Sequence, residues 1–364
     1  MIEELERLLK RGVKKIMKKI KLRVSEGVTL FTILHFLVDG ICALVIFSAL
    51  YNNDYNQCLT IFLVYNFLAF LTQPLVGLLI DKYNYPKLFL IIAVGCLMLG
   101  IVFKAWYLPS SILLGIGNSF FHVSGGKYVT EKTNNGIASL GLFVSTGAIG
   151  LVVGQRYYTN TLLIVFSLLT ILIMFILTLS EERKEDVKPF TIVRYSMGIK
   201  YFVVLFALII TVMIRSFVGK ICIIDFQTSN FVFLLMGIMT AGGKALGGVM
   251  SKYLGVTKTI VISMVISFIT LVFFNDNLYL TLFGIVAFNT TMPITLWYMN
   301  KMLNKKLGFA FGILAAGLIP GYLLGMLFSD VLIRQILIGS LSVLSIGLIF
   351  GVKKMEMTLS ENIE

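Results

Sequence analysis

The run VTLFTILHFLVDGICALVIFSAL, residues 28–50, determines the class of fold to which this chain belongs. A helix needs about 20 apolar residues to cross the hydrocarbon core of a membrane, and this run is long enough. Asp39 lies near its middle, and His35 precedes it by one helical turn, so both side chains share one helix face. An ionised carboxylate at mid-membrane costs roughly 3 kcal/mol on insertion scales. We therefore expect Asp39 to have a partner or a function.

The rest of the chain repeats this apolar character. Hydrophobic residues make up 58% and charged residues 13% of the sequence, and the mean hydropathy is +0.93. Soluble domains are about half apolar and a quarter charged. The sequence therefore predicts an all-α polytopic membrane protein. Its twelve predicted spans are 28–50, 58–80, 88–107, 109–127, 137–155, 160–180, 201–226, 229–250, 259–274, 278–300, 308–328 and 332–352.

The positions of the basic residues predict the orientation of the chain. A net charge of +13 is also typical of nucleic-acid binding, but most of the 31 Lys and Arg residues fall in alternate connections and in the two ends of the chain. This is the positive-inside bias of membrane proteins. It predicts cytoplasmic N and C termini and no nucleic-acid partner. The four cysteines show no metal-ligand spacing, so we interpret them as packing residues and expect no metal site or cofactor.

Polar interruptions divide the chain into five segments. Residues 2–22 have apolar positions at helical spacing among many lysines, which predicts an amphipathic helix on an anionic lipid surface. This arm is either a topology anchor or a regulatory or partner-binding segment. The predicted segments are a cytoplasmic helix at 1–27, a six-helix bundle at 28–180, a cytoplasmic linker at 181–200, a second six-helix bundle at 201–352 and a tail at 353–364.

A motif at the end of the second span recurs in the second half. The stretch QPLVGLLIDKYNYPK, residues 73–87, has an echo 170 residues later at 247–253, where Ser251 replaces the acid. The first copy resembles the signature of the major facilitator superfamily between its second and third helices. The resemblance implies two pseudo-symmetric six-helix bundles. It also implies a conformational latch on the cytoplasmic side, formed by Gly77, Asp81, Lys82 and Lys87.

Three further stretches resemble the fosmidomycin-resistance branch of that superfamily. They are HFLVD at 35–39, GIGNSFFH at 115–122 and RSF at 215–217. In the superfamily fold, spans 1, 4, 7 and 10 line a central cavity, so the resemblance implies that charged residues of these spans share one space. It assigns proton coupling to Asp39, His35 and His122, and substrate binding to Arg215, Asn289 and Asn118.

Each assignment has a structural alternative. Asp39 and Arg215 are also consistent with a buried ion pair that fixes helix packing, and His122 with a packing histidine. Asn289 is equally consistent with a hydrogen bond to its own backbone. Lys244, about two turns inside the eighth span, is either functional or a packing residue.

The sequence holds no GxSxG, HExxH, Walker A or Rossmann motif, so it predicts no enzyme. The resemblance implies a monomeric secondary transporter of the cell membrane that exports a small compound or drug, with an anion favoured by Arg215. Glycines in the span at 137–155 resemble those of antiporters. A proton-coupled importer of a sugar or organic acid is the alternative. A non-transporting sensor or assembly partner is the alternative from another class.

Overall fold

The computed structural model describes residues 21–182, 195, 197–222, 229–274, 276–327 and 331–361. The predicted arm at 2–22 lies outside these residues apart from its last two, as does most of the 181–200 linker. The elements are β1 (Lys21–Leu22), α2 (Val24–Asn52), α3 (Tyr55–Asn66), the π-helix η1 (Phe67–Leu71), α4 (Gln73–Tyr83), α5 (Pro86–Val102), α6 (Tyr107–Lys132), α7 (Ile137–Arg156), α8 (Asn160–Leu179), β2 (Glu181–Glu182), α9 (Ile199–Ile221), α10 (Asn230–Leu254), α11 (Val256–Phe273), α12 (Leu278–Asn289), α13 (Thr291–Met302), α14 (Leu307–Ala316), α15 (Leu318–Gly325) and α16 (Val331–Glu361).

The all-α prediction is confirmed, and in the described residues every predicted span coincides with one helix or with two or three consecutive helices. Ten of these segments are long and apolar enough to cross a membrane, and Pro86–Val102 is a shorter apolar helix. The chain is therefore an integral membrane protein. Two features differ from the prediction. The two-residue strands β1 and β2 pair in parallel, and α16 continues to Glu361, through most of the segment predicted as a tail.

Prolines interrupt three of the spans. Pro74 follows η1 by three residues, Pro293 lies just after the end of α12, and Pro320 lies just after the end of α14. A proline has no N–H to donate to the carbonyl four residues earlier, and its ring clashes with that carbonyl. The carbonyl four residues before Pro74 lies in η1. Those before Pro293 and Pro320 belong to the last residues of α12 and α14. The breaks within these spans therefore follow from the prolines.

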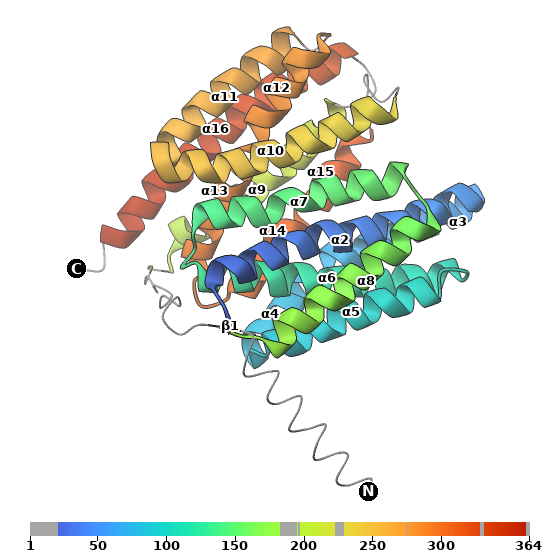
Figure 1. The fold of residues 1–364 in the computed structure, drawn as a ribbon. Coiled ribbons are helices and arrows are strands. Elements are labelled where there is room, and N and C mark those ends of the chain that lie inside the picture. Colours follow the sequence, from blue (N-terminus) through green and yellow to red (C-terminus); the bar gives the residue numbers. More distant parts are fainter. Residues whose placement is uncertain are drawn as a thin grey trace, which may run out of the picture.

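The helices pack in two groups that meet along two seams. In Figure 1, α7 and α10 run beside each other between the helices of the first and second halves. The other seam joins α4 to α14. Glycines permit both approaches: a Cβ on Gly77 would clash with the backbone of Gly308, and one on Gly248 would lie 2.7 Å from the carbonyl oxygen of Ile137. Small residues let membrane helices approach to backbone contact.

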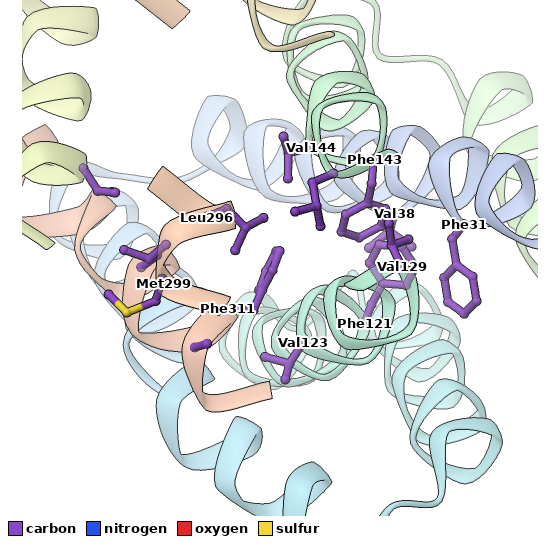
Figure 2. Close-up of a cluster of buried hydrophobic side chains, with 14 of the residues drawn as sticks. Phe31, Val38, Phe121, Val123, Val129, Phe143, Val144, Leu296, Met299 and Phe311 are labelled. Carbon is purple, nitrogen blue, oxygen red and sulfur yellow. The ribbon is translucent and has the colours of Figure 1, made fainter. Parts of the chain in front are cut away.

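Large apolar side chains fill the space between these seams. Figure 2 shows Phe143 of α7, Phe121 and Val123 of α6 and Phe311 of α14 directed into one cluster. Phe121 and Phe143 are fully buried. This packed cluster lies beside the polar residues of α2, α6 and α7, and it holds their helices in fixed relative positions.

Candidate functional site

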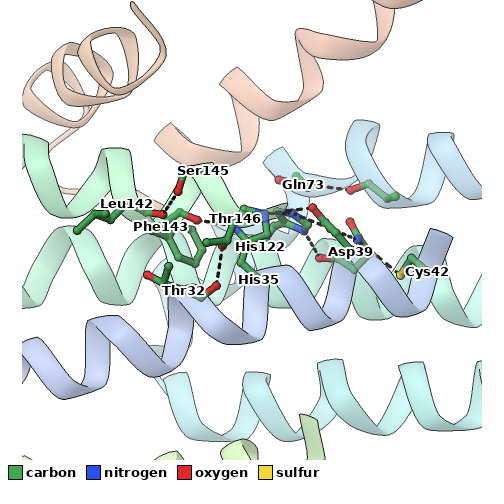
Figure 3. Close-up of polar contacts among 12 residues, drawn as sticks. Thr32, His35, Asp39, Cys42, Gln73, His122, Leu142, Phe143, Ser145 and Thr146 are labelled. Carbon is green, nitrogen blue, oxygen red and sulfur yellow. Dashed lines mark hydrogen bonds and ion pairs between the residues drawn. The ribbon is translucent and has the colours of Figure 1, made fainter. Parts of the chain in front are cut away.

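Two histidines and one carboxylate meet between α2 and α6. The Nε2 atoms of His35 and His122 lie 2.8 Å apart. The carboxylate of Asp39 lies 3.3 Å from Nε2 of His35 and 3.4 Å from Nε2 of His122. Figure 3 shows the three side chains directed toward one another. Both histidines are buried, whereas 20% of the Asp39 side chain is exposed. We name these three residues the His–Asp–His site.

Backbone carbonyls fix the proton on each imidazole. Nδ1 of His35 lies 2.6 Å from the carbonyl oxygen of Phe143, and Nδ1 of His122 lies 2.9 Å from that of Asn118. A carbonyl oxygen only accepts hydrogen bonds, so each Nδ1 carries the hydrogen and donates it. In a neutral imidazole the other nitrogen then presents a lone pair. Two lone pairs and a carboxylate thus converge on one point.

Two further residues shape this site. Nδ2 of Asn118 donates a 3.1 Å hydrogen bond to Oδ1 of Asp39 and so orients the carboxylate. Gly147 of α7 lies against Asp39 and the His35 ring. A Cβ at this position would clash with Oδ2 of Asp39 and with the His35 ring, so only glycine leaves the room that the site occupies.

Arg215 and Lys244 bring positive charge to the same region from the second half. Arg215 of α9 is buried, and its Nη1 donates a 3.3 Å hydrogen bond to Oγ1 of Thr295 in α13. Lys244 of α10 lies close enough to both Arg215 and Asp39 to interact with their charges. In the described part of the chain, no ion pair within 4.0 Å is formed by Arg215 or Lys244. The partners of Asp39 are therefore the two histidines, where the sequence suggested Arg215.

The polar residues of the tenth predicted span are directed to their own backbone. Nδ2 of Asn289 donates to the carbonyl of Ile285, and the Thr290 hydroxyl donates to the carbonyl of Ala287. Of the three residues predicted to bind substrate, Asn118 is hydrogen-bonded to Asp39 of the His–Asp–His site, and Arg215 lies near Lys244. Asn289 packs beside Gly243 with a backbone-bonded amide.

Asp81 joins the two halves at one end of the molecule. Its Oδ1 and Oδ2 accept 2.9 Å hydrogen bonds from the backbone N–H groups of Gly308 and Phe309, at the start of α14. The ammonium of Lys127 in α6 lies 3.0 Å from Oδ1 of Asp81. The positive end of a helix stabilises a carboxylate placed there. We name Asp81, Lys127, Gly308 and Phe309 the clasp.

A second group of hydrogen bonds crosses between the halves at this end. Nδ2 of Asn300 in α13 donates to Oγ1 of Thr130 and to Oδ1 of Asn135, both at 3.1 Å. Asn135 in turn donates to the carbonyl of Trp297 at 3.0 Å. Together with the clasp, these bonds close the two halves against each other at this end.

The other two basic residues of the predicted latch lie elsewhere. Lys82 lies over the ring of Tyr83, and Lys87 donates hydrogen bonds to the carbonyls of Thr178 and Ser180 at the end of α8. The base beside Asp81 is Lys127, which the sequence did not indicate. It lies 46 residues from Asp81 along the chain, so local spacing gives no sign of the contact.

An apolar groove lies between α3 and η1 of the first half and α15 of the second half. It measures about 610 Å³ and is lined by apolar residues of α3, η1, α6 and α15, with Asn66 at its side. Phe62 of α3 and Leu323 of α15 face it from the two halves. The clasp joins the two halves at one end, and beside this groove they also meet, with the rings of Phe62 and Tyr322 6.2 Å apart.

No protein-family model matches this chain, and no curated protein matches its sequence. Solved structures do match. The crystal structure of the E. coli fucose:proton symporter FucP aligns with a TM-score of 0.65 at 11% identity, over 93% of this chain and 100% of that chain. The crystal structure of a bacterial homologue of the iron transporter ferroportin, in an outward-facing state, aligns with a TM-score of 0.57, also at 11% identity and with the same coverage.

These similarities agree with the fold that residues 73–87 imply. The finer resemblance to the fosmidomycin-resistance branch stays a prediction. The chain shares the fold of these two membrane proteins over almost all of its length.

Proposed function

We propose that this protein is a secondary active transporter that exports a small anionic compound, coupled to protons, by alternating access. The observation that carries the proposal is the pairing of two unlike sites buried between the helices. The first half holds a cluster of acceptors, the His–Asp–His site. The second half holds two cations, Arg215 and Lys244, without ion pairs in the described residues.

The first site needs a positive ion. Its two imidazole lone pairs and one carboxylate repel one another when nothing lies between them, and burial strengthens that repulsion. A proton on one Nε2 converts the contact into an N–H···N hydrogen bond and places a positive charge beside Asp39. The fold shared with a fucose:proton symporter supports a proton in this role.

The second site needs a negative ion. Arg215 is buried with one hydrogen bond from its guanidinium to Thr295, although that group has five donors. Lys244 adds a second positive charge nearby. Buried charges are expected to have partners. A carboxylate, phosphate or phosphonate group of a substrate provides one, and it also screens the repulsion between the two cations.

The clasp and the groove support alternating access. The halves are held together at the clasp end by bonds to Asp81 and Asn300, and an apolar groove lies between α3 and α15. By the predicted orientation, the clasp end faces the cytoplasm. Opening of the clasp would expose the two charged sites to that side.

Import by symport is the second candidate. The likeness to a fucose:proton symporter favours it, because a symporter moves proton and substrate in the same direction. In the exporter, protons and substrate move in opposite directions; in the importer, they move in the same direction.

Proteoliposomes with an imposed pH gradient test the proposal. A panel of small carboxylates, phosphates, phosphonates and sugars is offered to the wild type, to Asp39→Asn and to the exposed control Asp276→Asn. We expect an anion to move against the direction of the proton gradient in the wild type and the control, and a protonophore to abolish that movement. Movement of substrate with the protons supports the importer. Gradient-driven transport by Asp39→Asn equal to that of the wild type would contradict the coupling role.

A further inference from the structure

The His–Asp–His site has the ligand geometry of a metal centre. One atom from each of His35, Asp39 and His122 lies within 4.8 Å of the other two. Two imidazole nitrogens and one carboxylate oxygen are ligands that zinc and other divalent transition metals accept, whereas magnesium and calcium prefer oxygen alone. The local sequence does not predict this site, because His122 comes from a different helix.

The distances favour a metal ion over a proton as the group that satisfies all three ligands. Ligands about 2.0–2.1 Å from a tetrahedral ion are separated by about 3.3 Å. The two nitrogen–oxygen separations are 3.3 and 3.4 Å. A charge-assisted N–H···O bond is shorter, about 2.7–2.9 Å. A proton shared by the two imidazole rings therefore leaves both histidine–carboxylate distances longer than a charge-assisted hydrogen bond. A metal ion fits all three ligands if the two Nε2 atoms, now 2.8 Å apart, separate by about 0.5 Å.

The surroundings of the ligands match those of metal-binding histidines. Such histidines donate their other N–H to a carbonyl or carboxylate, which fixes the tautomer and aims the lone pair. Both histidines do so here, toward Phe143 and toward Asn118. The Asn118 amide orients the carboxylate in the same way. One fifth of the Asp39 side chain is exposed, so an ion can reach the carboxylate.

We propose that His35, Asp39 and His122 bind one divalent transition-metal ion of the zinc, iron and manganese class. Lys244 opposes this binding by its charge, and Asp39 offsets one of the two positive charges of the ion. A further consequence rests on the proposed function: a metal ion in this site excludes the coupling proton. Metal binding itself does not depend on transport.

Direct binding of metal to the full-length protein in detergent tests the proposal. The protein is purified with a tag that contains no histidine and is stripped with a chelator. Zn²⁺ binding is then measured by titration calorimetry, and Co²⁺ binding by visible absorption. The melting temperature of the protein is compared between buffers that contain Zn²⁺ and buffers that contain Mg²⁺. We expect one Zn²⁺ per chain, Co²⁺ bands of a site with nitrogen ligands, and a rise in melting temperature with Zn²⁺ but not with Mg²⁺.

Variants locate the bound ion. His122→Gln and His35→Gln should each weaken Zn²⁺ binding at least tenfold, whereas Asp276→Asn, in an exposed turn, should bind as the wild type does. A wild type that binds neither Zn²⁺ nor Co²⁺ overturns the proposal, whatever the variants do, and so does unchanged binding by both histidine variants. Proton-driven transport without metal binding rejects the metal site alone. Metal binding without proton-driven transport rejects the proposed function alone.

Discussion

The carboxylate of Asp81 accepts a 2.9 Å hydrogen bond from the backbone N–H of Gly308, although the two residues are 227 positions apart in the chain. Asp81 lies in the last turn of α4 in the first half, and Gly308 is the second residue of α14 in the second half. The bond therefore crosses the seam at which the halves must separate if the protein opens at this end. Its acceptor is a carboxylate at a helix N-terminus, so its strength depends on charge.

Asp81→Asn is expected to open the clasp. The substitution removes the negative charge and one of the two acceptor oxygens, while the shape is kept. Hydrogen bonds to charged groups contribute about 1.5–3 kcal/mol, so the open population should rise about tenfold or more. Val123 faces Phe311 in the cluster beside the clasp (Figure 2) and is fully buried. A single cysteine at Val123, in a background without native cysteines, should react faster with a thiol reagent in the variant.

Glu131→Gln is the matched control for this experiment. Glu131 pairs with Lys127 within α6, and among the described residues it forms no ion pair with α14, so its neutralisation leaves the contacts of Asp81 in place. Equal labelling rates in Asp81→Asn and the wild type would show that the clasp does not govern opening.

Gly147→Ala is expected to disrupt the His–Asp–His site without removing any of its charged groups. The new Cβ would clash with Asp39 and His35, so the two side chains must move apart. Gradient-driven transport should fall at least tenfold. Gly95 of α5 is the control, because a Cβ there meets nothing within 4 Å. Gly95→Ala should retain transport and change the free energy of unfolding by no more than about 1 kcal/mol, the difference in helix propensity. Normal transport by Gly147→Ala would count against the site.

Asp39→Asn is expected to abolish accumulation of substrate while binding of substrate remains. Arg215 is not the ion-pair partner of Asp39, so the double variant Asp39→Asn/Arg215→Gln should not recover stability or transport. Melting temperature and gradient-driven uptake measure the two properties. Recovery of both in the double variant would indicate a structural ion pair and would remove Asp39 from the coupling mechanism.

Arg215→Gln and Lys244→Gln are expected to weaken binding of the transported anion. Loss of a hydrogen bond to a charged group costs about 1.5–3 kcal/mol, which corresponds to roughly 10-fold to 100-fold in affinity. Arg215→Lys should recover only part of the loss, since an ammonium lacks the planar pair of donors. The affinity of each variant is measured by competition binding with the compound that the wild type transports. Affinities that are unchanged in both glutamine variants would place the substrate elsewhere.

Labelling of single cysteines tests the predicted orientation. Asn53, between α2 and α3, and Asn277, before α12, should react with an impermeant reagent added outside intact cells. Asn84, in the exposed turn between α4 and α5, should react only after the cells are opened. Ser196, in the predicted cytoplasmic linker but outside the described residues, should behave like Asn84. The reverse pattern would place the clasp on the outside of the cell.

The sequence by itself determined the class of fold, because membrane insertion depends on local apolar length. Where the structure describes them, the predicted runs are helical at nearly the predicted positions, and the spacing of His35 and Asp39 on one helix face was sufficient to place them side by side. The π-helix before Pro74 and the breaks beside Pro293 and Pro320 were not predicted, although the proline positions carry that signal.

Only the tertiary structure decided which side chains meet across helices. His122 joins His35 from 87 positions away, and Lys127, which has no special local context, lies beside Asp81. Arg215 faces Thr295 instead of Asp39. Local hydrophobic pattern sets the length and depth of a span but leaves its rotation and its neighbours open. Those depend on packing at close approaches such as that of Gly77 to Gly308, where contacts from distant parts of the chain act together.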